Sequence, residues 1–171
     1  MLTKELLKNT DLGKHLSQDC LDAVFPILVR NSFSKTFESG EIIRRRGDPA
    51  EHLMVVKDGL MKSFDYTKRG EQIFFYYFSR NQMAGLISCI NNTLSQADDV
   101  AEQRTTIVYI AREDYLRACQ LIPEFQGEVL RLVCRNADRQ IEISILSRCK
   151  YARDLFHFSC RKKDGAFSVD L

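Results

Sequence analysis

The 171-residue sequence has no tryptophan, only three prolines and no long apolar run. Its longest strongly apolar stretch, Ile73–Phe78, is far shorter than the roughly 20 residues that a membrane-spanning helix requires. Polar and charged residues interrupt the N-terminal segment, so it lacks the apolar region of a signal peptide. We therefore expect a cytoplasmic protein that does not contact membranes.

An excess of one charge and the common catalytic motifs are missing as well. The 25 Lys and Arg residues are balanced by 23 Asp and Glu residues, which leaves no global field to attract nucleic acid. The six cysteines form no C-x-x-C pair and the three histidines are isolated. No zinc-protease, nucleophile-elbow or phosphate-loop motif occurs. We expect free buried thiols, no metal, no cofactor and no enzymatic activity.

The hydrophobic pattern divides the chain into regions of different periodicity. Residues 1–30 are typical of short helices, and Pro26 predicts that any helix there is short or starts anew. Residues 31–111 contain short alternating segments separated by turn residues, which predicts antiparallel strands. Residues 112–149 change to the helical period, with a short helix followed by a long one that begins at Pro123. This order predicts a mainly β domain, a sandwich or barrel, followed by helices.

The long helix has two apolar sides. One is a seam of residues at helical spacing: Leu130, Cys134, Ala137, Ile141 and Ile145. A helix with two apolar sides needs two partners, which are best supplied by its own β domain and a second copy of the chain. A homodimer is therefore expected, and a monomer whose helix has a wide apolar face is the alternative.

Two segments of the strand region allow different interpretations. The run Ile73–Phe78 places aromatic side chains on both faces of a strand, so we expect both faces to be covered. Plain packing and a ligand against Tyr76 or Tyr77 both satisfy this expectation. The run Arg44–Arg46 resembles a DNA-binding patch, but alternation turns its middle residue away from its neighbours, which favours a solvated face.

Five glycines punctuate the strands where tight turns need a residue without Cβ: Gly40, Gly47, Gly59, Gly70 and Gly85. Their spacing, followed by a long helix, resembles the cyclic-nucleotide-binding β-roll of the CRP/FNR family of transcription regulators. The resemblance implies a double-stranded β-helix, or jelly roll, over residues 31–111. It also implies a dimerisation helix within residues 112–149 and the start of a DNA-binding domain at residues 150–171.

The sequence departs from the cyclic-nucleotide-binding members of that family. The family glycine matched by Gly85 is followed by a glutamate that binds ribose, whereas this chain has Leu86. Ser95 or Gln96 falls where those members have the arginine that pairs with the cyclic phosphate. Only one cysteine precedes residue 89, so the clustered N-terminal cysteines of the iron–sulfur branch are absent too. We expect a small effector other than a cyclic nucleotide, either apolar or aromatic.

The family places its effector between the β-roll and the long helix. The residues matched to that location are Tyr76, Tyr77, Met83, Gly85, Leu86, Leu130, Arg131 and Cys134. In the family, effector binding alters how the two long helices cross and thereby controls DNA binding.

The family's helix-turn-helix would follow the last residues of this chain. Either the chain has been shortened at this boundary, which we expect, or the protein naturally lacks its DNA reader. Operator DNA would then be contacted only through the missing C-terminal domain. Two other functions remain open: a cupin-like metal-dependent enzyme, for which His52 is the only histidine in the strand region, and a ligand-free interaction module.

Overall fold

A computed structural model of the chain describes residues 1–148, so the segment 150–171 expected to open a DNA-binding domain lies outside the described residues. The chain divides into two compact units, Met1–Val133 and Cys134–Leu171. The elements in chain order are α1 (Lys4–Asn9), η1 (Gly13–His15), α2 (Gln18–Val29), β1 (Phe33–Phe37), β2 (Ile42–Arg44), β3 (His52–Asp58), β4 (Leu60–Tyr66), β5 (Gln72–Ser79), β6 (Met83–Ala84), α3 (Leu86–Asn91), β7 (Asp98–Ala101), β8 (Thr105–Ala111), α4 (Arg112–Leu121) and α5 (Pro123–Arg148).

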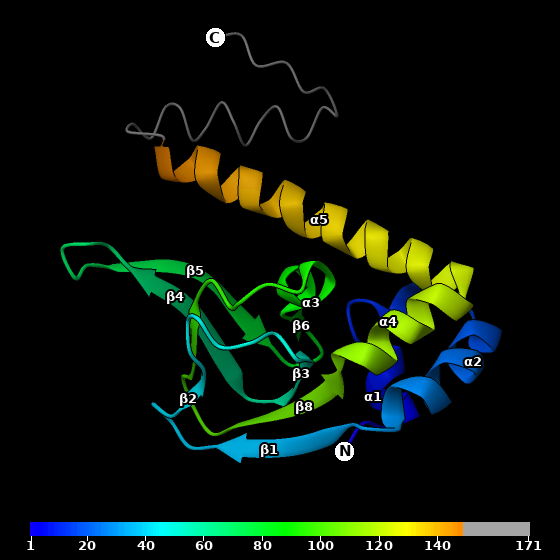
Figure 1. Cartoon of the computed structure of the whole chain (residues 1–171). Helices are drawn as coiled ribbons and strands as arrows, with labels where there is room; N and C mark the ends of the chain where they lie inside the picture. Colours follow the sequence, from blue (N-terminus) through cyan, green and yellow to red (C-terminus); the bar gives the residue numbers. More distant parts are fainter. Residues whose placement is uncertain (149–171) are drawn as a thin grey trace, which may run out of the picture. The chain divides into compact units, whose positions relative to one another are not determined.

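The eight strands form two antiparallel sheets that together make a jelly roll (Figure 1). One sheet has the strand order β1-β8-β3-β6 and the other has the order β2-β7-β4-β5. Side chains from both sheets pack inside the roll, among them Met54, Met61 and Ile107. The mainly β architecture followed by a long helix is therefore confirmed.

The helices of the first unit bury the outer face of β3 and β8. Alternation sends Met54 into the roll and its neighbour Val55 outward, so β3 is buried on both faces. Val55 and Val108 pack in one cluster with apolar side chains of α1, α2, α4 and the first turns of α5, including Phe125. This cluster ties the start of α5 to the strands.

Helix α2 runs without interruption from Gln18 to Val29, which corrects the prediction that Pro26 shortens or restarts it. Proline cannot donate the hydrogen bond that the carbonyl of Asp22 would accept in a regular helix. Both residues are exposed, so water can hydrogen-bond to that carbonyl. The buried face of α2 and the Ser17 cap, whose hydroxyl accepts from the amide of Cys20, outweigh the lost bond.

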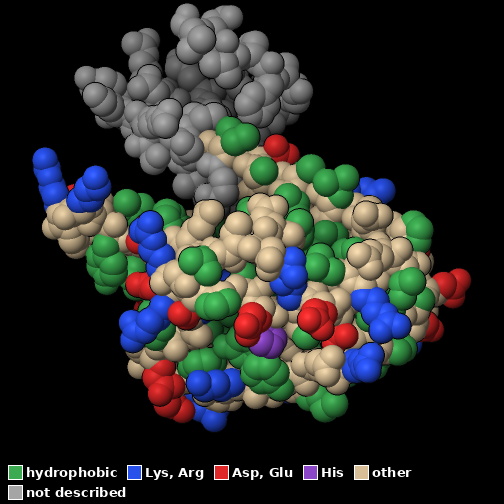
Figure 2. Space-filling model, viewed as in Figure 1, with side chains coloured by type: hydrophobic (Ala, Val, Ile, Leu, Met, Phe, Trp, Pro, Cys, Tyr) green, Lys and Arg blue, Asp and Glu red, His purple; other side chains and the backbone are tan. Residues whose placement is uncertain are grey.

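The aromatic strand β5 is only partly covered by the described residues of the first unit. Phe78 packs against the interior of the roll. Ile73, Phe74 and Tyr77 remain exposed, and hydrophobic side chains are visible at the surface beside the basic tip of the β4–β5 hairpin (Figure 2). The complete cover expected for both faces is therefore not supplied within this unit.

Two turn glycines with similar backbone angles allow steric clash to be separated from backbone strain. At Gly40, with φ +84°, a Cβ would meet nothing within 4 Å, whereas at Gly59, with φ +92°, a Cβ would lie 2.6 Å from the Arg104 carbonyl oxygen. We expect Gly40→Ala to lower the free energy of unfolding by about 1–2 kcal/mol, the cost of a left-handed conformation. Gly59→Ala should cost at least about 2 kcal/mol more because the backbone must also shift. Urea unfolding of both variants tests this, and equal losses would contradict it.

Candidate functional site

An arginine from β2 lies inside the roll. The pairing of β2 with β7 shifts register between Ile42 and Arg44, so Ile43 is an extra residue in the ladder. As a result Arg44 faces Asp99 directly across the ladder, on the side of β7 that also buries Ala101. The side chain of Arg44 is only 14% exposed and that of Asp99 only 1%.

Arg44 and Asp99 form a buried ion pair. Nε of Arg44 donates to Oδ2 of Asp99 at 2.8 Å, and Nη2 lies 2.6 Å from the same oxygen. Burial raises the pKa of the Asp99 carboxyl above its ordinary value, although Arg44 and the facing Ser63 act in the opposite direction. The pair therefore places two compensating charges in an interior that is otherwise mainly apolar.

The remaining terminal nitrogen of this arginine lies beside the turn that precedes α3. A Cβ added at Gly85 would lie 3.0 Å from Nη1 of Arg44 and 3.5 Å from the carbonyl oxygen of His52. Nη1 is buried and has no hydrogen-bond partner among residues 1–148. The absence of a side chain at Gly85 is what makes room for the guanidinium.

Three aromatic rings, one each from β1, β3 and β8, form a cluster. Phe33 stacks on Tyr109 with centroids 4.7 Å apart, and His52 stands edge-on to both rings at 5.3 and 5.9 Å. Phe33 is exposed, whereas His52 and Tyr109 are half-buried. Burial raises the pKa of Tyr109 to about 12, with Arg44 lowering it and Asp99 raising it, so the phenol lies within electrostatic reach of the ion pair.

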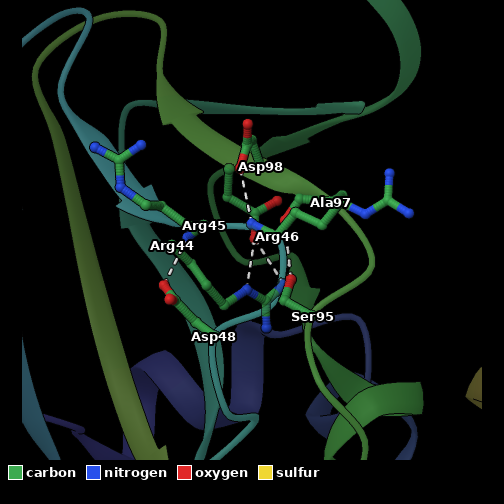
Figure 3. A network of polar contacts seen from close by, with 8 residues as sticks. Arg44, Arg45, Arg46, Asp48, Ser95, Ala97 and Asp98 are labelled. Carbon is green, nitrogen blue, oxygen red and sulfur yellow. Dashed lines mark hydrogen bonds and ion pairs between the residues drawn. The ribbon is translucent and has the colours of Figure 1, made fainter. Parts of the chain in front are cut away.

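The segment 95–98 serves as a structural clamp on the turn after β2 (Figure 3). The amide of Ser95 donates to the carbonyl of Asp48, its carbonyl accepts from the amide of Gly47, and its hydroxyl donates to the carbonyl of Ala97. The carboxylate of Asp98 accepts from the amide of Arg46 at 2.7 Å. Ser95 is thus buried with its polar groups engaged, while Gln96 is exposed.

The other two arginines of the run behave as the sequence predicts. Arg45 is exposed, and its amide donates to the carboxylate of Asp48. Arg46 is exposed and pairs with Asp65. The run is thus solvated at two of its three positions, whereas Arg44 was not expected inside. The sequence favoured a solvated face for the whole run, and no sequence signal marks the bulge at Ile43 that turns Arg44 inward.

The structure distributes the predicted strand residues of the effector site over different surroundings. The hydroxyl of Tyr76 accepts from the side-chain amide of Gln82 at 3.2 Å, while Tyr77 is exposed on the outer face. Met83 and Leu86 are buried in the cluster shared with the helices, and Gly85 lies between them beside Arg44. Gly85 thus adjoins the interior ion pair, whereas Tyr77 and Met83 lie in other surroundings.

The predicted helix residues lie on α5 with exposed side chains. Leu130 is 64% exposed, and Arg131 is exposed and donates to Glu128 at 2.9 Å. In the second unit Cys134, Ala137 and Ile141 are exposed, and the side chain of Ile145 lies outside the described residues. The seam expected for dimerisation is thus a surface stripe wherever it is described.

The described residues contain no cluster suited to a metal ion. Among the side chains that the structure describes, no three His, Cys, Asp or Glu gather in a way that could hold one. Cys89 is buried, and burial raises the pKa of its thiol to about 11, so this thiol stays protonated at neutral pH. No helix among residues 1–148 combines the length and apolarity needed to cross a membrane.

Comparison with known proteins places this geometry in context. Residues 34–121 match the family described as "Cyclic nucleotide-binding domain". The chain is 23% identical, over 90% of its length, to the transcriptional activator protein Anr of Pseudomonas aeruginosa, of which it spans 64%. The fold resembles the catabolite activator protein of Thermus thermophilus, with TM-score 0.66, 21% identity and coverage of 80% of this chain and 62% of that one.

A second solved structure matches the domain over nearly its full length. The sensor domain of the transcriptional regulator DNR from Pseudomonas aeruginosa has TM-score 0.65 and 17% identity to this chain. The match covers 87% of this chain and 94% of that one. The chain spans less than two thirds of the length of the curated relatives that it matches.

Proposed function

The chain belongs to the cyclic nucleotide-binding domain family, and from this premise we propose that it is the effector-sensing and dimerisation module of a CRP/FNR-like transcription regulator. The effector is a small molecule other than a cyclic nucleotide, bound between the β-roll and the start of α5. The role is regulatory rather than catalytic. In the whole regulator, operator DNA is contacted by a domain that follows this module.

The lack of a charged donor at the phosphate-binding position carries the proposal against cyclic nucleotides. A cyclic phosphate is an anion that needs a charged hydrogen-bond donor, and cyclic-nucleotide-binding relatives keep an arginine at this position. Here that position holds Ser95 or Gln96, neither of which is charged; Ser95 is buried with its polar groups engaged with Asp48, Gly47 and Ala97, and Gln96 is exposed. Leu86, which replaces the ribose-binding glutamate, is buried in an apolar cluster.

The interior arginine, Arg44, does not take over the role of the missing phosphate-binding arginine. Arg44 is already paired with Asp99, so a second anion at this place meets a carboxylate that is 1% exposed. Burying an uncompensated negative charge costs several kcal/mol. The aromatic side chains of β5 favour an apolar or aromatic effector instead, with Tyr76 and Tyr77 as the proposed contacts.

Signal transmission is proposed to run through α5. Phe125 and Val129 anchor its first turns in the same cluster as the strand residue Val108. The exposed stripe that begins at Leu130 continues along the helix and is proposed to pair with the same stripe of a second copy. An effector that binds two arrangements of this helix pair with different affinity shifts the population between them.

Isothermal titration with cyclic AMP and cyclic GMP tests the choice of effector class. We expect no saturable heat at nucleotide concentrations up to about 1 mM, a concentration at which any complex worth more than about 4 kcal/mol is detectable. The controls are 5′-AMP and 5′-GMP, which separate weak binding of the purine ring from recognition of the cyclic phosphate. Saturable binding of either cyclic nucleotide, but not of its control, would overturn the proposal.

A further inference from the structure

The ion pair inside the roll leaves one strong hydrogen-bond donor unused. Nε and Nη2 of Arg44 are both directed at Oδ2 of Asp99, at 2.8 and 2.6 Å. Nη1 is buried without a hydrogen-bond partner among the described residues, and so is the acceptor Oδ1 of Asp99. Buried donors are almost always paired in folded proteins, so an unpaired guanidinium N–H in a ligand-binding family calls for an acceptor from outside the chain.

The charge of that acceptor follows from Asp99. Because Asp99 compensates Arg44, the pair is neutral overall, and an anionic ligand would bring a net negative charge into a buried, mainly apolar interior. A neutral carbonyl or amide oxygen accepts the same hydrogen bond without that cost. The unused donor therefore suits an uncharged ligand.

The surroundings of Nη1 add a preference for a flat apolar group. The backbone of His52 passes beside the same point, since its carbonyl oxygen and Nη1 lie 3.5 and 3.0 Å from the position that a Cβ would take at Gly85. The ring of His52 belongs to the cluster with Phe33 and Tyr109. Half-buried aromatic rings offer stacking and edge contacts to an aromatic ligand.

We propose that the effector is an uncharged aromatic molecule whose acceptor oxygen binds Nη1 of Arg44 and whose ring contacts the Phe33–His52–Tyr109 cluster. This inference rests on the proposed function, specifies the ligand class, and places the ring of the effector against the Phe33–His52–Tyr109 cluster instead of Tyr76 and Tyr77. It also assigns a contact to β2, whereas the expected site residues come from β5, the β6–α3 turn and α5. Asp99 acts as a selectivity residue, since its charge excludes anions.

Benzamide and benzoate provide a matched test because they have nearly the same shape and differ in charge. In an NMR titration of the 171-residue chain we expect benzamide to bind at least about tenfold more tightly than benzoate, with shifts centred on Arg44, His52 and Tyr109. Asp99→Asn keeps the size of the side chain but removes its charge, so it should reverse the preference to benzoate by about tenfold. Arg45→Met, which removes an exposed arginine of the same run, should leave the wild-type preference unchanged.

A second variant keeps the inference testable if Asp99→Asn does not fold. The double substitution Arg44→Met with Asp99→Leu removes both charges and should abolish benzamide binding. Binding of neither probe to the native chain, a preference of the native chain for benzoate, or benzamide binding that survives the double substitution would each overturn the inference. Cyclic-nucleotide binding would instead overturn the proposed function, so the two failures are distinguishable.

Discussion

Arg44→Met is expected to lower the free energy of unfolding by about 3–5 kcal/mol, as is typical when one partner of a buried ion pair is removed. Methionine fills much of the same volume but leaves Asp99, which is 1% exposed, without its cation. Urea unfolding followed by far-ultraviolet circular dichroism measures the loss. The same change at the exposed Arg45 is the control and should cost no more than about 0.5 kcal/mol.

The pH dependence identifies the cause of that loss. Burial raises the folded-state pKa of Asp99 above 3.8, and Arg44 opposes this rise, so the pKa rises further when Arg44 is removed. Above pH 3.8 the unfolded variant releases a proton that its folded state retains, and its stability falls as the pH increases. The difference in the free energy of unfolding between the native chain and the Arg44→Met variant should therefore be largest near pH 7 and become smaller toward about pH 4. A deficit independent of pH would mean that lost packing, not an unpaired charge, is responsible.

Removing both charges of the Arg44–Asp99 pair tests whether the unpaired charge causes the loss of stability. Arg44→Met combined with Asp99→Leu leaves no buried charge, so its stability should return to within about 1 kcal/mol of the native chain or exceed it. If the double variant is as unstable as the single one, the pair contributes through its shape rather than its charge. The pair would then be needed for folding, and its use as a selectivity device would be unsupported.

Local sequence signals predicted the framework of this domain well. The five turn glycines, Gly40, Gly47, Gly59, Gly70 and Gly85, all have positive φ. The long helix begins at Pro123, as predicted, and is described as far as Arg148. The family match over residues 34–121 and the named relatives confirm the resemblance to CRP/FNR regulators. These features depend on residues close in the chain, which a sequence displays directly.

Features that depend on partners distant in the sequence were not predictable. Strand β7 begins with two aspartates, which weaken any strand signal, and its partners β2 and β4 supply the ladder that holds it. The inward turn of Arg44 comes from one register shift in the same ladder. The candidate site could not be predicted from the sequence, because it depends on a bulge in β2 and on a buried pair of residues that lie 55 positions apart in the chain.

Ile141→Asp is expected to convert a dimer of this chain into a monomer. Ile141 is 55% exposed on α5, in line with the exposed Leu130, Cys134 and Ala137 at spacings of three and four residues. A symmetric pairing of this stripe places both copies of the new carboxylate in an apolar seam, where each is desolvated without a partner. Because the change acts twice in each dimer, we expect dissociation to become easier by at least about a hundredfold, or roughly 3 kcal/mol.

Sedimentation equilibrium at micromolar concentration measures this shift, and Leu121→Asp provides the matched control. Leu121 is a 60% exposed apolar residue on α4 that is not part of the stripe, so the same chemical change there should leave the dimer intact. Both variants should keep the unfolding midpoint of the β-roll, because neither side chain belongs to its buried clusters. A native chain that is monomeric at these concentrations, or an Ile141→Asp variant that still dimerises, would show that the stripe does not pair two copies. Effector binding would then have to act through the start of α5 within a single chain, where Phe125 and Val129 connect it to the roll.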